Sequence, residues 1–368
     1  MNPDIARLQR QARELLPPAV YDYYAGGSGR ERTLRASERA WRRNWLAPRV
    51  LRDVRAVDTT TRLLGTPLRT PVAVAPTAYQ RLAHPEGELA TAAGAARAGA
   101  LFVLSTRSTR RLEEVASQVT GAGGTWWLQV YVMRSRAATT DLVRRAAAAG
   151  AQALVLTADT PVVGRKRRDA GVLAQIGADM MANLGPVPDP ADLDQSAGVT
   201  FADIGWLSQA SGGLPVVVKG VLRPDDALAC VAAGAAAIIV SNHGGRQLDG
   251  AMPAAWALPG VASALAGTPG EVPACVDGGI RTGEDVLAAV ALGAGAVFVG
   301  RPVLWALACG GADGVTELLT GLTDALAHAM ALAGAPALAQ VAGIFGRPPA
   351  DVGGEGASSG FGGPVTVG

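Results

Sequence analysis

The sequence predicts an α/β protein built as a (β/α)8 barrel, the TIM-barrel architecture, with an N-terminal helical extension and a long loop after the fourth strand. The first supporting observation is a recurring unit, in which a small-residue helix end and a glycine precede an apolar run. Glycine suits the left-handed end of a helix, and such runs are typical of strands buried on both faces. Repeated units of this kind predict parallel strands joined by crossover helices.

The second observation is the number of candidate strands, which is enough to close a barrel. We expect strands near residues 71–76, 101–105, 126–131, 153–158, 215–219, 237–241, 273–277 and 296–300. In a closed parallel barrel, the active site lies at the C-terminal ends of the strands. Candidate functional side chains stand at or just beyond these ends: Pro76, Ser105, Gln129, Tyr131, Thr157, Asp159, Lys219, Ser241, His243, Asp277 and Arg301.

The chain divides into three expected segments. Residues 1–60 form an N-terminal helical segment that packs on the barrel, with helices near residues 4–16 and 32–43. Residues 61–346 form the barrel itself, whose floor we expect to be closed by a short hairpin at residues 63–68. Within it, residues 160–213 are rich in Gly, Pro and charge, which predicts a lid-like insertion. Residues 347–368 are rich in Gly, Pro and Ser and are expected to form a disordered tail.

Composition narrows the function classes. A net charge of +2 and an aromatic content of 5% argue against a nucleic-acid-binding surface. The three cysteines are widely spaced and no histidine cluster exists, so no metal site is predicted. Residues 1–10 lack the apolar segment of a signal peptide, and the apolar runs are too short to span a membrane. We therefore expect a cytoplasmic protein without a membrane partner.

The most informative stretch is Ser-Asn-His-Gly-Gly-Arg-Gln at residues 241–247, directly after an apolar run. His243 is the leading candidate for a proton acceptor, since only imidazole titrates unperturbed near neutrality. The other two histidines have structural interpretations, because His84 precedes a proline and His328 lies in the last helix. The planar fork of Arg246 matches a carboxylate. Together they suggest a carboxylic acid that loses a proton nearby.

Two glycine-and-arginine turns end the seventh and eighth strands. Gly279 with Arg281, and Gly300 with Arg301, stand where barrels commonly bind phosphate through backbone amides and cations. No strand is followed by Gly-x-Gly-x-x-Gly and a helix, so neither a Rossmann nicotinamide site nor a Walker P-loop is supported. Tight turns are the alternative interpretation of these glycines.

Roughly from residue 16 to residue 346, the sequence resembles the FMN-dependent 2-hydroxy acid oxidases and dehydrogenases, the glycolate oxidase-like family. The resemblance rests on motifs at residues 21–27, 75–78, 84–88, 128–131, 157–161 and 241–247, and on the two glycine-and-arginine turns. The sequence at residues 75–82 resembles the 4-hydroxymandelate oxidases most. The loop at residues 241–247, with its matched partners along the chain, is the most specific of these signals.

The resemblance implies a role for each catalytic residue. His243 would take the proton during oxidation, and Asp159 would stabilise the imidazolium that forms. Arg246 would bind the substrate carboxylate with help from Tyr23, while Tyr131 would hydrogen-bond the substrate hydroxyl. Three of these residues also have a structural interpretation: the two tyrosines as core residues, and Asp159 as the cap of a turn.

The resemblance also implies FMN as the cofactor. Lys219 would lie beside the N1/O2 edge of the flavin, where a fixed cation stabilises negative charge, although it could instead be an incidental outward-pointing lysine. The rest of the FMN site would comprise Pro76, Thr77, Ala78, Ser105, Gln129, Thr157 and Ser241 around the ring and ribityl chain, Asp277 at the ribityl hydroxyls, and Gly279, Arg281, Gly300 and Arg301 at the phosphate.

Two positions depart from the family pattern. Arg107 stands where glycolate-type members carry a substrate-side tryptophan, and Lys166 stands where a second carboxylate-binding arginine is usual. Lysine keeps the charge but lacks the bidentate fork. Arg107 either faces the substrate side chain, which favours an anionic or strongly polar substrate, or turns to solvent. We count both among the substrate-binding residues.

The predicted function is FMN-dependent oxidation of an (S)-2-hydroxy acid to the 2-keto acid, with an aryl acid such as mandelate or 4-hydroxymandelate favoured. The electrons would pass to dioxygen or to a quinone or protein, and the resemblance implies a homotetramer. One alternative is flavin-dependent oxidation of a peptide or natural-product intermediate. Another is a non-catalytic flavin-binding barrel.

Overall fold

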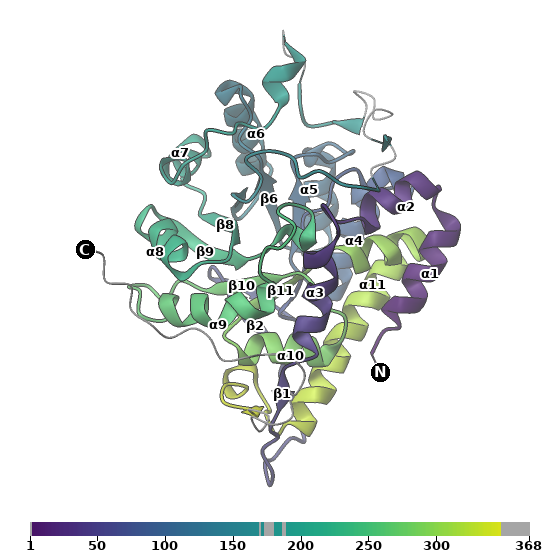
Figure 1. Ribbon diagram of the computed structural model, residues 1–368, viewed down its shortest axis with the longest axis vertical. Helices are drawn as coiled ribbons and strands as arrows, with labels where there is room; N and C mark the ends of the chain where they lie inside the picture. Colours follow the sequence, from purple (N-terminus) through teal and green to yellow (C-terminus); the bar gives the residue numbers. More distant parts are fainter. Residues whose placement is uncertain (1, 169–170, 173–179, 186–188, 347–368) are drawn as a thin grey trace, which may run out of the picture.

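The centre of the protein is a closed barrel of parallel strands (Figure 1). The computed structural model describes residues 2–168, 171–172, 180–185 and 189–346. Within them, the barrel strands are β4 (Val72–Val74), β5 (Phe102–Ser105), β6 (Trp126–Val130), β7 (Leu154–Thr157), β8 (Val216–Val221), β9 (Ala235–Val240), β10 (Ala274–Asp277) and β11 (Ala296–Val299). Neighbours in sequence pair in parallel, and β11 pairs with β4 to close the ring. The eight predicted strands and the (β/α)8 fold are confirmed.

Alternation along each strand divides the buried side chains into two layers. Inward-facing residues such as Val155, Val217 and Ile239 form a compact cluster inside the barrel. Leu63 and Leu68 join this cluster from the antiparallel strands β2 (Thr61–Leu63) and β3 (Thr66–Leu68). The predicted hairpin therefore does close the barrel floor, which leaves the opposite, C-terminal end of the strands for the site.

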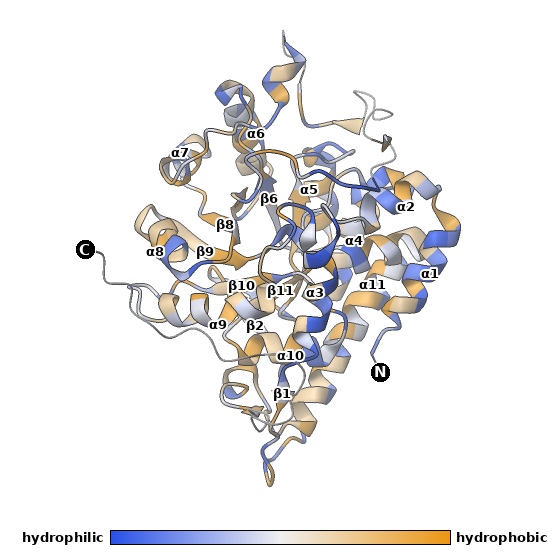
Figure 2. Cartoon of the chain, in the orientation of Figure 1, coloured by the Kyte–Doolittle hydropathy of each residue, from blue (hydrophilic) through white to orange (hydrophobic). Residues whose placement is uncertain are grey.

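The outward-facing side chains pack against a ring of helices. The helices are α4 (Glu88–Ala98), α5 (Leu112–Gly121), α6 (Arg136–Ala148), α7 (Ala202–Ala210), α8 (Pro224–Ala232), α9 (Ala254–Leu265), α10 (Gly283–Ala291) and α11 (Arg301–Leu332). Figure 2 shows hydrophobic residues along β8 and β9, as expected for strands covered on both faces. Among the described residues, no helix combines the length and apolarity that crossing a bilayer requires.

The range 160–213 contains more regular structure than a lid-like insertion implies. Its last part forms α7, which packs on β7 and β8 as a crossover helix. The long connection after the fourth barrel strand therefore ends before residue 202. Residues 347–368, expected to be a disordered tail, lie outside the described residues.

The N-terminal segment packs beside the barrel as α1 (Ile5–Leu15), α2 (Pro18–Ala25) and α3 (Arg32–Trp41) (Figure 1). The first and third match the predicted helices, whereas α2 was not predicted. Pro18 occupies its first turn, a position where the missing N–H and the fixed φ of proline are tolerated. Tyr23 and Tyr24 are buried, so α2 ends close to the site. A short antiparallel pair, β1 (Trp45–Leu46) with β12 (Phe345–Gly346), joins the segment after α3 to the last described residues.

Candidate active site

A cavity of about 400 Å³ opens at the C-terminal ends of the barrel strands. Most of the site residues expected from the sequence line it: Tyr23, Pro76, Thr77, Ala78, Ser105, Arg107, Gln129, Tyr131, Thr157, Lys166, Lys219, His243, Arg246, Asp277, Gly279, Arg281, Gly300 and Arg301. The remaining two, Asp159 and Ser241, lie directly behind lining residues and hydrogen-bond to them. The structure thus brings the expected residues together.

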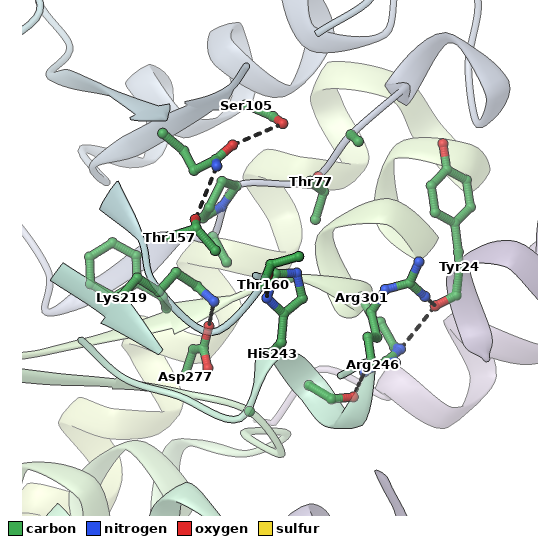
Figure 3. Close-up of a pocket in the computed structure, with 18 of the residues that line it drawn as sticks. Tyr24, Thr77, Ser105, Thr157, Thr160, Lys219, His243, Arg246, Asp277 and Arg301 are labelled. Atoms are coloured by element: carbon green, nitrogen blue, oxygen red, sulfur yellow. Dashed lines mark hydrogen bonds and ion pairs between the residues drawn. The ribbon is translucent and has the colours of Figure 1, made fainter. Parts of the chain in front are cut away.

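His243 is placed by the backbone of the loop after β9. It starts a 3-10 turn, His243–Gly245, and has a φ of 56°, in the left-handed region that side chains other than glycine rarely adopt. The Ser241 hydroxyl accepts a hydrogen bond from the His243 backbone N–H at 3.0 Å, and the Asn242 side chain accepts one from Gly245 N–H at 3.2 Å. These contacts stabilise the unusual conformation and turn the imidazole toward the cavity (Figure 3).

The imidazole is oriented by Asp159. His243 Nδ1 lies 2.9 Å from Asp159 Oδ1, so Nε2 is the nitrogen left for a ligand. Burial lowers the pKa of His243 below its ordinary 6.5, against the opposing charge of Asp159, and the nearby cation Lys219 lowers it further. Burial works to raise the pKa of Asp159, but His243 and Lys219 hold it below its usual value. The pair is therefore a neutral imidazole next to an ionised carboxylate, which is the state of a general base.

Lys219 provides a fixed cation at the end of β8. The lysine is 4% exposed, and its Nζ lies 3.0 Å from Asp277 Oδ2 and donates to Ser241 Oγ at 2.9 Å (Figure 3). Burial works to lower its pKa, but Asp277 and Asp159 raise it above the ordinary value, so the amine stays charged. The other carboxylate oxygen, Asp277 Oδ1, is buried and accepts no hydrogen bond within the described chain. That acceptor needs a donor such as a ligand hydroxyl.

Arg246 uses one nitrogen of its guanidinium for contacts within the protein and keeps the other two available for a ligand. Its Nη1 donates to the carbonyl oxygens of Tyr23 at 2.7 Å and Gly26 at 3.0 Å, at the C-terminal end of α2. The guanidinium carbon lies 5.1 Å from the centre of the Tyr23 ring. Within the described chain, all hydrogen bonds that its guanidinium donates run through Nη1. Nη2 and Nε are left to bind an acceptor such as a carboxylate.

A second group of cations lies at the β10 and β11 ends of the cavity. Arg301 donates to the carbonyl oxygens of Tyr24, Gly244 and Gly26, as Figure 3 shows in part. Burial lowers the pKa of Arg301 to about 9, and the positive charges of Arg246 and Arg281 add to this effect. An arginine crowded by cations is stabilised by an anion. The site therefore suits a phosphate group.

Gly279 lines the same part of the cavity as these arginines. An added Cβ there would lie 2.3 Å from the backbone oxygen of Ser37, and the φ of 89° also favours glycine.

On the opposite wall, Gln129 donates to Thr157 Oγ1 at 3.0 Å and accepts from Ser105 Oγ at 3.2 Å (Figure 3). One cavity thus combines the cation Lys219, the unsatisfied acceptor Asp277 Oδ1 and a group of arginines that suits a phosphate. The residues present therefore fit FMN.

Several lining residues were missed at the level of sequence. They include Tyr24, Tyr79, Thr160 and Gln247. Tyr24, Thr160 and Gln247 stand inside motifs that carry the family resemblance, and Tyr79 lies in the stretch 75–82, so their position was the available signal. Gln247 Nε2 donates to the backbone oxygen of Asp159 at 3.1 Å and thereby ties the two catalytic loops together.

Comparisons with known proteins point to one family. Residues 12–344 match a family model described as FMN-dependent dehydrogenase. A 4-hydroxymandelate oxidase of Amycolatopsis orientalis is 45% identical over 90% of this chain and 94% of its own length. An L-lactate oxidase of Nostoc sp. is 43% identical over 90% of the chain and 94% of that relative. A solved structure of mandelate oxidase with (S)-4-hydroxymandelic acid superposes with a TM-score of 0.84 at 43% identity, over 92% of this chain and 96% of the other.

Proposed function

This chain belongs to the FMN-dependent dehydrogenase family, and we propose that it oxidises an (S)-2-hydroxy acid with an aromatic side chain, such as mandelate or 4-hydroxymandelate, to the 2-keto acid. It is an oxidoreductase of the FMN-dependent 2-hydroxy acid oxidase family, with FMN as its cofactor. The observation that carries the proposal is that one cavity holds the His243–Asp159 pair and the available side of Arg246. A base beside a carboxylate clamp suits abstraction of a proton near a carboxyl group.

The oxidation removes two electrons and two protons from the substrate, one proton from C2 and one from the hydroxyl group. FMN, when bound, supplies the acceptor for the electrons. Arg246 binds the substrate carboxylate through Nη2 and Nε and thereby fixes the position of C2. His243 Nε2 accepts a proton from the substrate, and Asp159 stabilises the imidazolium that results.

Tyr131 and Lys219 complete the proposed mechanism. Burial raises the pKa of the Tyr131 phenol, against the cations Lys219, Arg107 and Arg246, so the hydroxyl stays protonated. It donates a hydrogen bond to the oxygen on C2 as that oxygen changes from hydroxyl to carbonyl. Lys219 stays charged beside the cavity and stabilises negative charge that develops on the electron acceptor.

The choice of an aryl acid rests on the aromatic residues of the cavity. Tyr23 and Tyr79 are buried, with ring centroids 6.3 Å apart, and Tyr131 lines the same space. Flat apolar faces of this kind suit the phenyl ring of a mandelate. The relatives named above for 4-hydroxymandelate and mandelate support the same choice. Because the two relatives described above are oxidases by name, we propose dioxygen, rather than a quinone or a protein, as the final acceptor.

The proposed function predicts that (S)-mandelate bleaches the FMN absorbance of the purified protein under anaerobic conditions. We expect (S)-mandelate to act faster than (R)-mandelate, lactate or glycolate, and to yield phenylglyoxylate. Readmitted oxygen should restore the yellow colour and produce hydrogen peroxide. Fast bleaching by lactate or glycolate alone would exclude the aryl preference. A yellow protein that is inert to every acid in the panel would instead indicate a non-catalytic flavin-binding barrel.

A further inference from the structure

A second arginine of the cavity, Arg107, is not explained by the oxidation chemistry. It lies on the loop after β5, where it is partly buried and lines the cavity. Its Nη1 donates to the Tyr79 hydroxyl at 3.2 Å, and its guanidinium carbon lies 5.9 Å from the centre of the Tyr131 ring. The side chain therefore faces the tyrosines of the cavity rather than bulk solvent.

Arg107 lacks the carboxylate partner that some other partly buried arginines have. Arg145 pairs with Glu113 at 2.8 Å, and Arg281 pairs with Glu38 at 2.6 Å. The guanidinium of Arg107 forms no ion pair with any described carboxylate. Its hydrogen bond and its ring contact are both with tyrosines. A guanidinium withdrawn from water without an anion is costly, so the cavity is electrostatically incomplete at this point.

The protein backbone holds Arg107 in place from both sides. Tyr79 has a φ of 58°, a strained left-handed conformation for a tyrosine, and its N–H donates to the Arg107 carbonyl at 3.0 Å. The Tyr24 hydroxyl donates to the Tyr79 carbonyl at 2.6 Å. Beneath them, the buried carboxylate of Glu88 accepts from Thr109 N–H at 3.0 Å. Two loops are thus fixed to each other at the point where Arg107 enters the cavity.

The cavity therefore contains two arginine–tyrosine pairs. Arg246 lies over the Tyr23 ring, and Arg107 lies over the Tyr131 ring. Burial raises the pKa of Tyr23 to about 12, while the charges of Arg246 and, more weakly, Arg107 oppose that rise. Both arginines consequently act on the same phenol. Arg246 and Arg107 are thus two cations that share the aromatic lining of one cavity.

We propose that Arg107 is a specificity-determining residue that binds an anionic group at the far end of the substrate. The preferred substrates are then doubly anionic 2-hydroxy acids, of which 4-carboxymandelate is a simple representative. This inference rests on the proposed function, because it concerns the substrate of the same site. A planar guanidinium suits a distal carboxylate particularly well, since it can donate two parallel hydrogen bonds.

The first test compares 4-carboxymandelate with mandelate in anaerobic reduction and steady-state turnover. We expect kcat/KM to favour the doubly anionic acid by about 10–100-fold, the range of a hydrogen bond to a charged group. Arg107→Met should remove this preference, and Arg107→Lys should restore part of it, since lysine keeps the charge without the fork. Arg111→Met is the matched control, because Arg111 is exposed and pairs with Glu113. It should keep the wild-type preference.

A second readout separates binding from turnover. Phenylacetate and 4-carboxyphenylacetate lack the hydroxyl group and cannot be oxidised in the same way, so their dissociation constants can be measured by perturbation of the flavin spectrum. We expect 4-carboxyphenylacetate to bind more tightly to the wild type but not to Arg107→Met. Equal affinities in the wild type would overturn the role of Arg107. Failure of every acid to reduce the flavin would instead refute the proposed function, while the analogue affinities would still decide the role of Arg107.

Discussion

Replacement of His243 by alanine is expected to leave the protein yellow and to slow its reduction by a 2-hydroxy acid by about 10²–10⁴-fold, the range that a positioned base contributes. The reason is that Nε2 of His243 is the proton acceptor in the proposed mechanism, and its other nitrogen is committed to Asp159 at 2.9 Å. FMN retention should be little affected, because most of the groups that fit the flavin lie at the ends of other strands, and Ser241 contacts the backbone of His243 rather than its imidazole. Stopped-flow absorbance with (S)-mandelate under anaerobic conditions measures the rate.

The matched control is His328→Ala, since His328 is exposed on α11. His84 is no alternative base, because it is not among the residues that line the cavity, and its Nδ1 accepts a hydrogen bond from Glu86 N–H at 3.3 Å in a turn. A His243→Ala variant that is reduced as fast as the wild type would show that another group takes the proton.

Replacement of Arg246 by methionine is expected to lower kcat/KM for 2-hydroxy acids by about 10²–10³-fold, the cost of truncating one partner of a buried charge pair. The loss should appear mainly as weaker binding of the substrate carboxylate. Arg246→Lys should lose less than the methionine variant, because the charge remains while the bidentate geometry is lost. The kcat and KM values of the two variants, measured with the same acid, separate charge from geometry.

Arg55→Met is the control for this substitution, because Arg55 is exposed and pairs with the exposed Asp53. The Arg246 variants also need a flavin spectrum, since the substitution removes the hydrogen bonds from Nη1 to carbonyl groups at the end of α2. Unchanged kcat/KM in an Arg246→Met variant that retains FMN would show that the substrate carboxylate binds elsewhere. Lys166 would then be the next candidate, because it lines the same cavity.

The barrel was predictable because its strands are buried on both faces. Runs such as that of β9 are almost continuously apolar, and the glycines between helix and strand mark where each unit begins. By contrast, α2 was missed, since the two prolines at its N-terminal end and its tyrosines are typical of a turn. Its stability comes from burial of Tyr23 and Tyr24 against the rest of the protein, which no local pattern reveals.

The site was predictable to the extent that a parallel barrel collects its strand ends. His243, Lys219 and Asp277 follow that rule directly. What the sequence could not provide was the conformation of the loops between them. The left-handed backbone of Tyr79, which sets the direction of Arg107, depends on hydrogen bonds from distant segments. The two interpretations of Arg107 therefore remained open until these contacts were known, and they place it in the cavity.

The pH dependence of anaerobic flavin reduction tests the central claim most directly, since it reports the protonation state of the base. His243 faces Asp159, Lys219, Arg246 and the Thr160 hydroxyl, and burial places its pKa below 6.5. The rate should therefore fall as the pH drops through a value below 6.5, where the imidazole becomes protonated. In Asp159→Asn the carboxylate charge that raises this pKa is absent, so the limb should move to lower pH and the maximal rate should decrease. A limb that stays in place in Asp159→Asn, or moves to higher pH, would contradict the assignment of the His243–Asp159 pair as the base.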